Sequence, residues 1–470
     1  MTQSYASHAR ALLVLGLPIV GSHLAQMALH VSDTILLGRY GVTELAVGVI
    51  GGTGFFVIFI LGSGFAQAVM PLVAAAVGRN DEVQVRRYAR MGMWLSLAFG
   101  LLTYPLFWVS EAWLLGLGQK PEVARLGQDF LRIAGWGMVP ALLVMALKSY
   151  LSALGRTQVV LWTTIGAVGV NFVIAYALIF GVWGMPEMGV RGAAIASLSV
   201  QAGTFAVLAV YAGWLPELRH FHLFQRFWRP DWQALGQVFR LGWPIGVTGL
   251  LEAGLFSGVS VMMGWIGTVE LASHGIALQV AALAFMVHLG LSNAVTVRTG
   301  HAEGAGDARG LRDGAKVAIA MSALFGLVMV ALFLAFPVAI LSLFLDMAKP
   351  ESAQIVAVGT VLLALAALFQ MGDAMQVMAL GLLRGIRDTQ VPMWAAAFSY
   401  WVIGIPASYV LAFPMGMGGV GLWLGLVVGL AAASGMLMWR FWHRAPRVAA
   451  GSDGALAAMS EPPAGVFSPK

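Results

Sequence analysis

The sequence contains no cysteine and few charged side chains. Without cysteine, the chain has no disulfides, no thiolate chemistry and no cysteine-ligated metal. Charged residues make up 10% of its 470 residues and the mean hydropathy is +0.84, whereas soluble proteins carry about 25% charged residues. So little charge cannot cover the surface of a soluble core. The composition therefore excludes a soluble enzyme, a disordered protein and a fibrous protein, and it indicates a polytopic membrane protein.

Enzyme motifs are missing as well. The chain has no HExxH zinc motif, no GxSxG nucleophile elbow and no Walker A phosphate loop. The segment Gly416–Gly421 formally fits GxGxxG, but it follows no soluble strand and opens an apolar stretch, so we interpret it as a turn. We therefore expect neither an enzyme nor an ATP-driven pump, and no cofactor beyond a coupling ion.

Long apolar stretches, in contrast, are numerous. About 20 apolar residues cross the hydrocarbon core of a bilayer. Twelve candidate spans cover residues 11–37, 45–72, 88–115, 127–150, 158–181, 191–214, 238–266, 271–297, 314–345, 353–384, 391–413 and 417–442.

The Lys and Arg residues indicate how these spans are oriented. With the N-terminus in the cytoplasm, 21 of the 27 Lys and Arg residues fall on the cytoplasmic side and 6 outside, which is the bias that positive residues show. The sequence thus predicts an all-α integral membrane protein with both termini in the cytoplasm. Its net charge of +6 follows from this topology, and we expect no nucleic-acid partner.

The two halves of the chain repeat each other. The segment 15–19 (LGLPI) returns as 241–245 (LGWPI), and the same offset of 226 pairs Gly64 with Gly290 and Gly78 with Gly304. An even number of spans separates the halves, which predicts a parallel repeat of two six-helix lobes. We expect an N-terminal lobe at 1–214, a cytoplasmic linker at 215–237, a C-terminal lobe at 238–443 and a disordered tail at 444–470.

The first predicted span carries a polar stripe. His23, Gln26, His30 and Asp33 are spaced by 3, 4 and 3 residues, so they fall within an arc of roughly 80° on a helix. Such a stripe must face protein or water, and Asn171 in the fifth span could join it. The stripe is either part of a functional site or a hydrogen-bonded seam that holds the first lobe together.

The second half contains two acids at membrane depth, Glu252 and Asp373. A charge there costs on the order of 2.5–3.5 kcal/mol, so these acids are candidate functional groups, although each could be a structural hydrogen-bonding group. The repeat aligns Glu252 with Gln26, and Gln370, Asp373 and Gln376 form a second stripe. A buried carboxylate of this kind can take a proton, bind Na⁺ or pair with an organic cation.

Several segments together resemble the multidrug and toxic compound extrusion (MATE) transporters, in particular their NorM-like branch. The resemblance covers about residues 10–443. It rests on Pro18, Asp33-Thr34 and Gly38, their counterparts Pro244 and Gly264, the acid Glu252, and the segments 294–300, 373–376 and 383–385.

This resemblance implies two six-helix lobes arranged as a V. It also implies that Glu252 and Asp373 form a cation site, with Na⁺ as one possible ion, and that Asp33 and Asn171 form a polar site in the first lobe, with Ser197 as a further member. Members that use the first-lobe site often have a second acid one turn after the asparagine. This chain has Ala175 there.

The implied activity is secondary active efflux of cationic or amphipathic drugs in exchange for Na⁺ or H⁺, by rocking of the two lobes. The expected setting is the bacterial inner membrane, with the protein as a monomer and small organic cations and the lipid bilayer as partners. One alternative is a lipid-linked saccharide flippase of related architecture. A channel is another.

Overall fold

The described part of the protein is helical throughout its regular structure. The computed structural model describes residues 4–345, 347 and 349–460. Eleven helices within these residues are long and apolar enough to cross a membrane, or twelve if one bent pair counts as a single span. This confirms the predicted all-α membrane fold. Helices are favoured because each satisfies its own backbone hydrogen bonds where lipid offers no partners.

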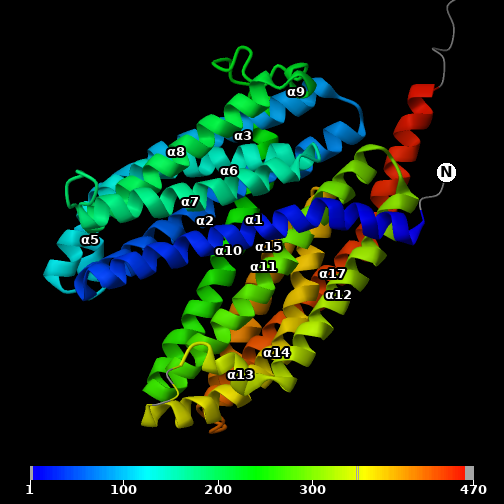
Figure 1. Ribbon diagram of the computed structural model, residues 1–470. Coiled ribbons are helices and arrows are strands. Elements are labelled where there is room, and N and C mark those ends of the chain that lie inside the picture. Colours follow the sequence, from blue (N-terminus) through cyan, green and yellow to red (C-terminus); the bar gives the residue numbers. More distant parts are fainter. Residues whose placement is uncertain (1–3, 346, 348, 461–470) are drawn as a thin grey trace, which may run out of the picture.

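The first half of the chain forms one lobe, the upper one in Figure 1. Its helices are α1 Tyr5–Tyr40, α2 Val42–Gly78, α3 Glu82–Trp108, α4 Ser110–Gly116, α5 Pro121–Trp136, α6 Met138–Ala153, α7 Thr157–Phe180, α8 Val190–Trp214 and the short α9 Pro216–Arg219.

The second half forms the lower lobe of Figure 1. Its helices are α10 Trp232–Ile266, α11 Thr268–Gly304, α12 Ala308–Ala335, α13 Pro337–Ser342, α14 Pro350–Gly385, α15 Gln390–Ala397, the π-helical segment Phe398–Gly404, α16 Ile405–Ala412 and α17 Gly418–Ser460.

The fourth span is bent. Helices α5 and α6 meet at an angle of 42° and together make this span. The break lies at Gly137, and Pro140 follows in the first turn of α6. A proline has no N–H to donate and its ring crowds the carbonyl four residues earlier, here that of Trp136, so a straight helix cannot pass this point.

The sequence repeat reappears as repeated helix caps. The Asp81 side chain accepts the Gln84 backbone N–H at 3.0 Å and begins α3, and Asp307 accepts the Gly310 N–H at 2.8 Å and begins α12. The two aspartates are 226 residues apart and occupy equivalent places in the two lobes. Aspartate at this position satisfies a backbone donor that the first helical turn leaves free.

The repeated glycines lie where the lobes cross. A Cβ on Gly64 of α2 would lie 2.3 Å from the Gly242 carbonyl oxygen and 2.4 Å from the Gly246 nitrogen, both in α10. At the equivalent crossing of α11 with α1, a Cβ on Gly290 would lie 2.8 Å from the backbone of Val20. Only glycine allows backbones this close. This explains why the repeat has glycine at both positions.

One end of the molecule is closed by contacts between the lobes. A Cβ on Gly78 would meet the His301 carbonyl oxygen at 2.3 Å, and one on Gly304 would meet the Ala75 carbonyl oxygen at 2.1 Å. The His301 Nε2 donates to the Ala153 carbonyl at 2.9 Å. We call this the closed end. It also carries the start of α1, marked N in Figure 1.

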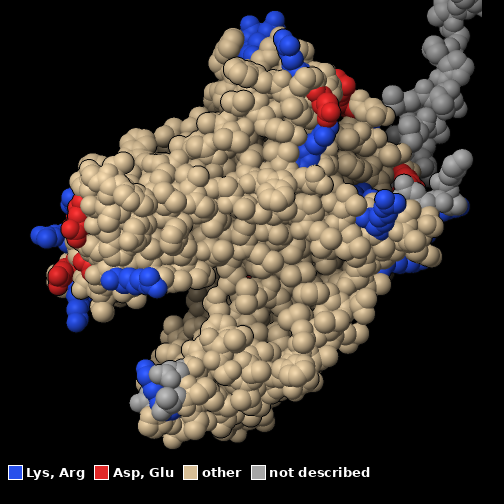
Figure 2. Space-filling model, viewed as in Figure 1, with Lys and Arg blue, Asp and Glu red and all other residues tan. Residues whose placement is uncertain are grey.

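The lobes diverge toward the opposite, open end. Figure 1 shows the V that they make, and Figure 2 shows the hollow between them on the molecular surface. Charged side chains in Figure 2 gather near the tips and the closed end, whereas the broad surface between them is almost free of charge. Large apolar side chains such as Leu102 and Trp162 are exposed on the molecule. This surface suits contact with lipid.

The linker and tail differ from their predicted bounds. Helix α10 begins at Trp232, so the irregular part of the linker ends at Asp231 and not at 237. Helix α17 continues to Ser460, past the predicted start of the disordered tail at 444. Alanines are frequent in this stretch and favour helix. Residues 461–470 of the predicted tail lie outside the described residues.

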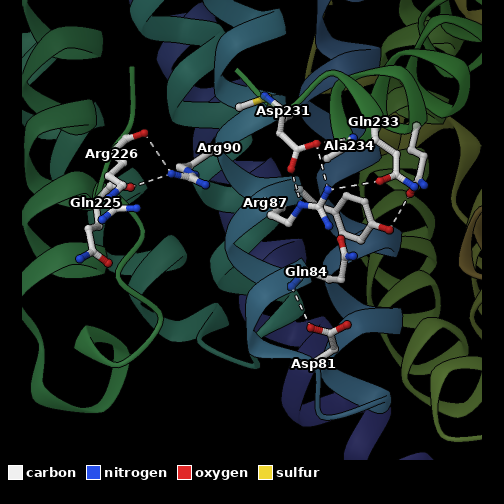
Figure 3. Close-up of polar contacts among 12 residues, drawn as sticks. Asp81, Gln84, Arg87, Arg90, Gln225, Arg226, Asp231, Gln233 and Ala234 are labelled. Carbon is white, nitrogen blue, oxygen red and sulfur yellow. Dashed lines mark hydrogen bonds and ion pairs between the residues drawn. The ribbon is translucent and has the colours of Figure 1, made fainter. Parts of the chain in front are cut away.

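The start of α10 is fastened to α3. Arg87 forms an ion pair with Asp231, in which its Nη2 donates to Oδ1 at 3.0 Å, and Tyr88 donates to the Gln237 side-chain oxygen at 2.6 Å. Asp231 also caps α10 by accepting the Ala234 N–H at 3.1 Å. Figure 3 shows the contacts of Asp231 with Arg87 and with Ala234. The first turn of the second lobe is thereby held against the first lobe.

Replacing Asp231 with Asn should weaken this contact at neutral pH only. The hydrogen bond from Arg87 lowers the pKa of Asp231 below its ordinary value of 3.8, so its contribution is complete above that value and is lost as the pH falls through the lowered pKa. Asn still caps the helix. Thermal unfolding should show a small loss of stability for D231N at about pH 7, up to about 1 kcal/mol, that shrinks as the pH falls below 3.8 and through the lowered pKa. A loss that stays the same over this whole pH range would contradict the charge-based explanation.

Candidate cation and substrate sites

The second lobe buries the polar stripe of α14. Gln370, Asp373 and Gln376 are spaced by three residues, so they share one face of α14, and all three are fully buried. Gln376 Nε2 donates to the Tyr400 hydroxyl at 2.5 Å. Glu252 of α10 interacts electrostatically with Asp373 and with Tyr400. The structure thus brings together the four residues predicted here and adds a tyrosine.

Many polar atoms of this cluster have no protein partner. Among the described residues, none bonds to Glu252 Oε1, Asp373 Oδ1, Gln376 Oε1 or either amide atom of Gln370. An unsatisfied buried polar group costs about 1–3 kcal/mol, so these atoms indicate a place for a ligand. Carboxylate and amide oxygens suit a small hard cation, and a carboxylate pair also suits a shared proton. The residues therefore fit Na⁺ or H⁺.

Tyr400 was not predicted as a site residue. It lies in the π-helical segment Phe398–Gly404, and Pro406 follows at the start of α16. Because Pro406 cannot donate a backbone hydrogen bond, the helix widens before it. Such a widened turn changes the direction of a side chain and is common at functional sites. A tyrosine shortly before an intramembrane proline is the signal that could have identified it.

The first lobe has a smaller polar site. Asn171 Nδ2 of α7 donates to Asp33 Oδ1 at 2.7 Å, and Ser197 of α8 donates to Asp33 Oδ2 at 3.5 Å. Asn171 is fully buried and its Oδ1 has no partner among the described residues. Ala175, one turn later, is also buried. This site therefore contains one acid, where the second lobe has two.

The remaining polar residues of α1 do not join Asp33. His23 Nε2 lies 3.0 Å from Asn293 Nδ2 of α11, in the other lobe. His30 is exposed and Gln26 is half-buried, and neither shows a side-chain hydrogen bond to a described residue. The four residues share a face but spread over ten positions, about 15 Å of helix. The neighbour of that face is α11 near the closed end and α7 and α8 farther along.

Removing the Asn171 side chain should weaken the Asp33 site more than removing the Ser197 hydroxyl. A hydrogen bond to a charged group is worth about 1.5–3 kcal/mol, and the Asn171 bond is the shorter of the two. In a test of Asp33 as a cation-binding group, Asn171→Ala should lower the affinity for an organic cation about tenfold, and Ser197→Ala by less than about threefold. Equilibrium binding of a fluorescent cation to the purified variants measures both. Equal effects would contradict the assigned geometry.

No cluster of three or more His, Asp or Glu side chains suited to a resident metal ion occurs in the described residues. Two further buried histidines of the second lobe are hydrogen-bonded: His274 lies 3.0 Å from Ser260, and His288 lies 2.9 Å from Ser322. Both histidines are thus bonded to serines of their own lobe, and we assign them no part in the cation site.

Comparisons with known proteins agree with this architecture. The sequence profile of the MatE family matches residues 18–177 and 244–410, so the two matches begin at the offset of the internal repeat. A probable multidrug resistance protein NorM of Rhizobium meliloti is 47% identical over 95% of this chain and 96% of its own length. A protein of the same description from Agrobacterium fabrum is 45% identical over 93% and 94%.

Solved structures share the fold. One, described as the outward-facing conformation of a multidrug resistance MATE family transporter of the MOP superfamily, has a TM-score of 0.85. It covers 94% of this chain and 96% of its own at 20% identity. The resemblance noted in the sequence is thereby confirmed. The chain belongs to the MatE family.

Proposed function

We propose that this protein is a secondary active multidrug exporter, which exchanges cationic or amphipathic compounds for Na⁺ or H⁺ by alternating access of its two lobes. The single observation that carries the proposal is the pair of buried acids, Glu252 and Asp373, each with one carboxyl oxygen that no described residue bonds, in a molecule open at one end. The relatives named as multidrug resistance proteins support the choice of cargo.

The proposed orientation places the closed end in the cytoplasm of a bacterium, at the inner membrane. The form described is then open to the outside. An ion entering from outside binds Glu252 and Asp373, and in our proposal Asp33 takes part in binding the cargo. The ion drives the cycle only if it binds one arrangement of the lobes better than the other, because equal affinities shift no equilibrium.

The lack of cysteine makes this orientation easy to test. Single cysteines at Gln225 in the linker and at Glu122 in α5 should react differently with a membrane-impermeant maleimide added to intact cells. We expect labelling at 122 only, with labelling at 225 after the membrane is opened. The reverse pattern would invert the proposed direction of transport.

Export in proteoliposomes tests the exchange itself. The purified protein is reconstituted, a fluorescent organic cation is loaded, and a sodium gradient or a proton gradient is imposed in separate samples. One gradient should drive the dye against its concentration difference, and reversing that gradient should reverse the flux. Dye movement that ignores both gradients would overturn the exchanger and favour a channel. The saccharide flippase is not favoured, because acids dominate both sites.

A further inference from the structure

We propose that a cavity at the end of α8 binds the phosphate group of an anionic phospholipid from the cytoplasmic leaflet. The cavity has a volume of about 570 Å³, within the range of small-ligand sites. It is lined by Gly213, Trp214, Arg219, His222, Leu223, Phe224 and Gln225. It lies outside the polar sites of both lobes. The proposal therefore does not depend on which cargo or coupling ion the protein uses.

The charges around the cavity suit an anion. Arg219 lines it, and Arg226 and Arg229 follow in the same linker. No described residue forms an ion pair with any of these three guanidinium groups, whereas the linker's acids are engaged: Glu217 pairs with Arg156, and Asp231 pairs as described above. Figure 2 shows Lys and Arg side chains gathered above this part of the molecule, at the top of the view.

An acid of α3 also approaches the linker. Glu82 lies 3.7 Å from His220, and both side chains are exposed. His222, on the cavity wall, forms no ion pair with a described residue. The cavity therefore combines the guanidinium group of Arg219 with the imidazole of His222, an arrangement that can hold a phosphate by charge and by hydrogen bonds.

The depth of the cavity indicates a lipid as the source of the phosphate. Trp214 ends α8 and Trp232 begins α10, and these side chains are 80% and 74% exposed. Trp228, between them, is 72% exposed. Tryptophans concentrate at the level of the lipid headgroups. The cavity at the end of α8 thus lies where headgroups lie, with the exposed Trp214 and Phe224 offering an apolar wall for the adjoining part of the lipid.

The wall of the cavity is fixed before any ligand arrives. Arg90 Nη1 of α3 donates to the carbonyls of Gln225 at 2.6 Å and Arg226 at 3.1 Å, as Figure 3 shows, and Trp94 donates to the Phe227 carbonyl at 2.8 Å. These bonds hold three consecutive linker carbonyls against the first lobe. A preformed wall loses little conformational freedom on binding, which favours affinity.

Lipid binding to the purified full-length protein tests the proposal. Native mass spectrometry gives dissociation constants for dioctanoyl phosphatidylglycerol, for zwitterionic dioctanoyl phosphatidylcholine and for soluble glycerol phosphate. Removing one cation at the headgroup level should lower the affinity for an anionic lipid several-fold. We therefore expect Arg219→Gln to weaken phosphatidylglycerol binding about fivefold and Arg219→Lys to preserve it. Phosphatidylcholine and glycerol phosphate should both bind more weakly than phosphatidylglycerol.

A matched control is Arg125→Gln, which removes an exposed arginine from α5 on the open side of the molecule. It should bind phosphatidylglycerol like the unchanged protein. Gel filtration and thermal unfolding show that each variant is folded, and Arg219 is itself exposed, so its loss leaves the core intact. Equal affinity in Arg219→Gln and Arg125→Gln would overturn the site. Glycerol phosphate binding as tightly as phosphatidylglycerol would overturn the lipid assignment.

Discussion

We expect Glu252→Gln and Asp373→Asn each to reduce ion-driven drug export at least about tenfold, with the protein still folded and inserted. Each change keeps the shape of the side chain and removes one of the two ionisable carboxyl groups. In our proposal, the site then no longer favours the ion-loaded arrangement enough for the gradient to drive the lobes. The measurement is uphill dye transport in proteoliposomes under the gradient that drives the unchanged protein.

The control for this result is Glu122→Gln, the same substitution at an exposed glutamate in the first turn of α5. It should transport like the unchanged protein. Expression and gel filtration of the variants must match, so that loss of export reports on the site and not on folding. Full export by Glu252→Gln at equal expression would remove Glu252 from the mechanism, and would leave its burial a matter of helix packing.

The sequence predicts those parts of the fold that depend on local pattern. Apolar length places the spans, and the offset of 226 identifies two lobes that the structure also contains. The spacing of Gln370, Asp373 and Gln376 predicts their common face, since helical periodicity alone decides it. The repeated aspartates at 81 and 307 follow the same rule, because a cap acts on the turn directly after it.

Contacts between distant segments could not be predicted in this way. The arc of His23 and Asp33 on α1 is visible in the sequence, yet which helix covers each part of it depends on how the lobes pack. His23 consequently contacts Asn293 of the other lobe, whereas Asp33 contacts Asn171. Tyr400 faces Gln376 because the helix widens before Pro406, and periodicity counted at 3.6 residues per turn misses a π-helical segment.

Gly64→Ala should destabilise the junction of the lobes and reduce export at least about tenfold. The new methyl group would lie 2.3 Å from the Gly242 carbonyl oxygen and 2.4 Å from the Gly246 nitrogen. These are backbone atoms and cannot rotate away, so α2 and α10 must separate. Overpacking of this kind costs about 1–3 kcal/mol, more than the gain of up to about 1 kcal/mol that alanine brings to a helix.

Two comparison variants distinguish an effect at the lobe junction from a general effect of replacing glycine with alanine in a helix. Gly166 in α7 has no atom within 4 Å of its Cβ position, so Gly166→Ala should unfold at the same or a slightly higher temperature and export normally. Gly290→Ala, the repeat partner of Gly64 in the other lobe, meets the Val20 backbone at 2.8 Å and should lose stability and export as Gly64→Ala does. Gly64→Ala behaving like Gly166→Ala would show that the lobes tolerate separation here. If Gly64→Ala and Gly290→Ala cause the same loss, the loss comes from the crossing of the lobes. The two glycines lie in different helices of different lobes and share only their place in the repeat.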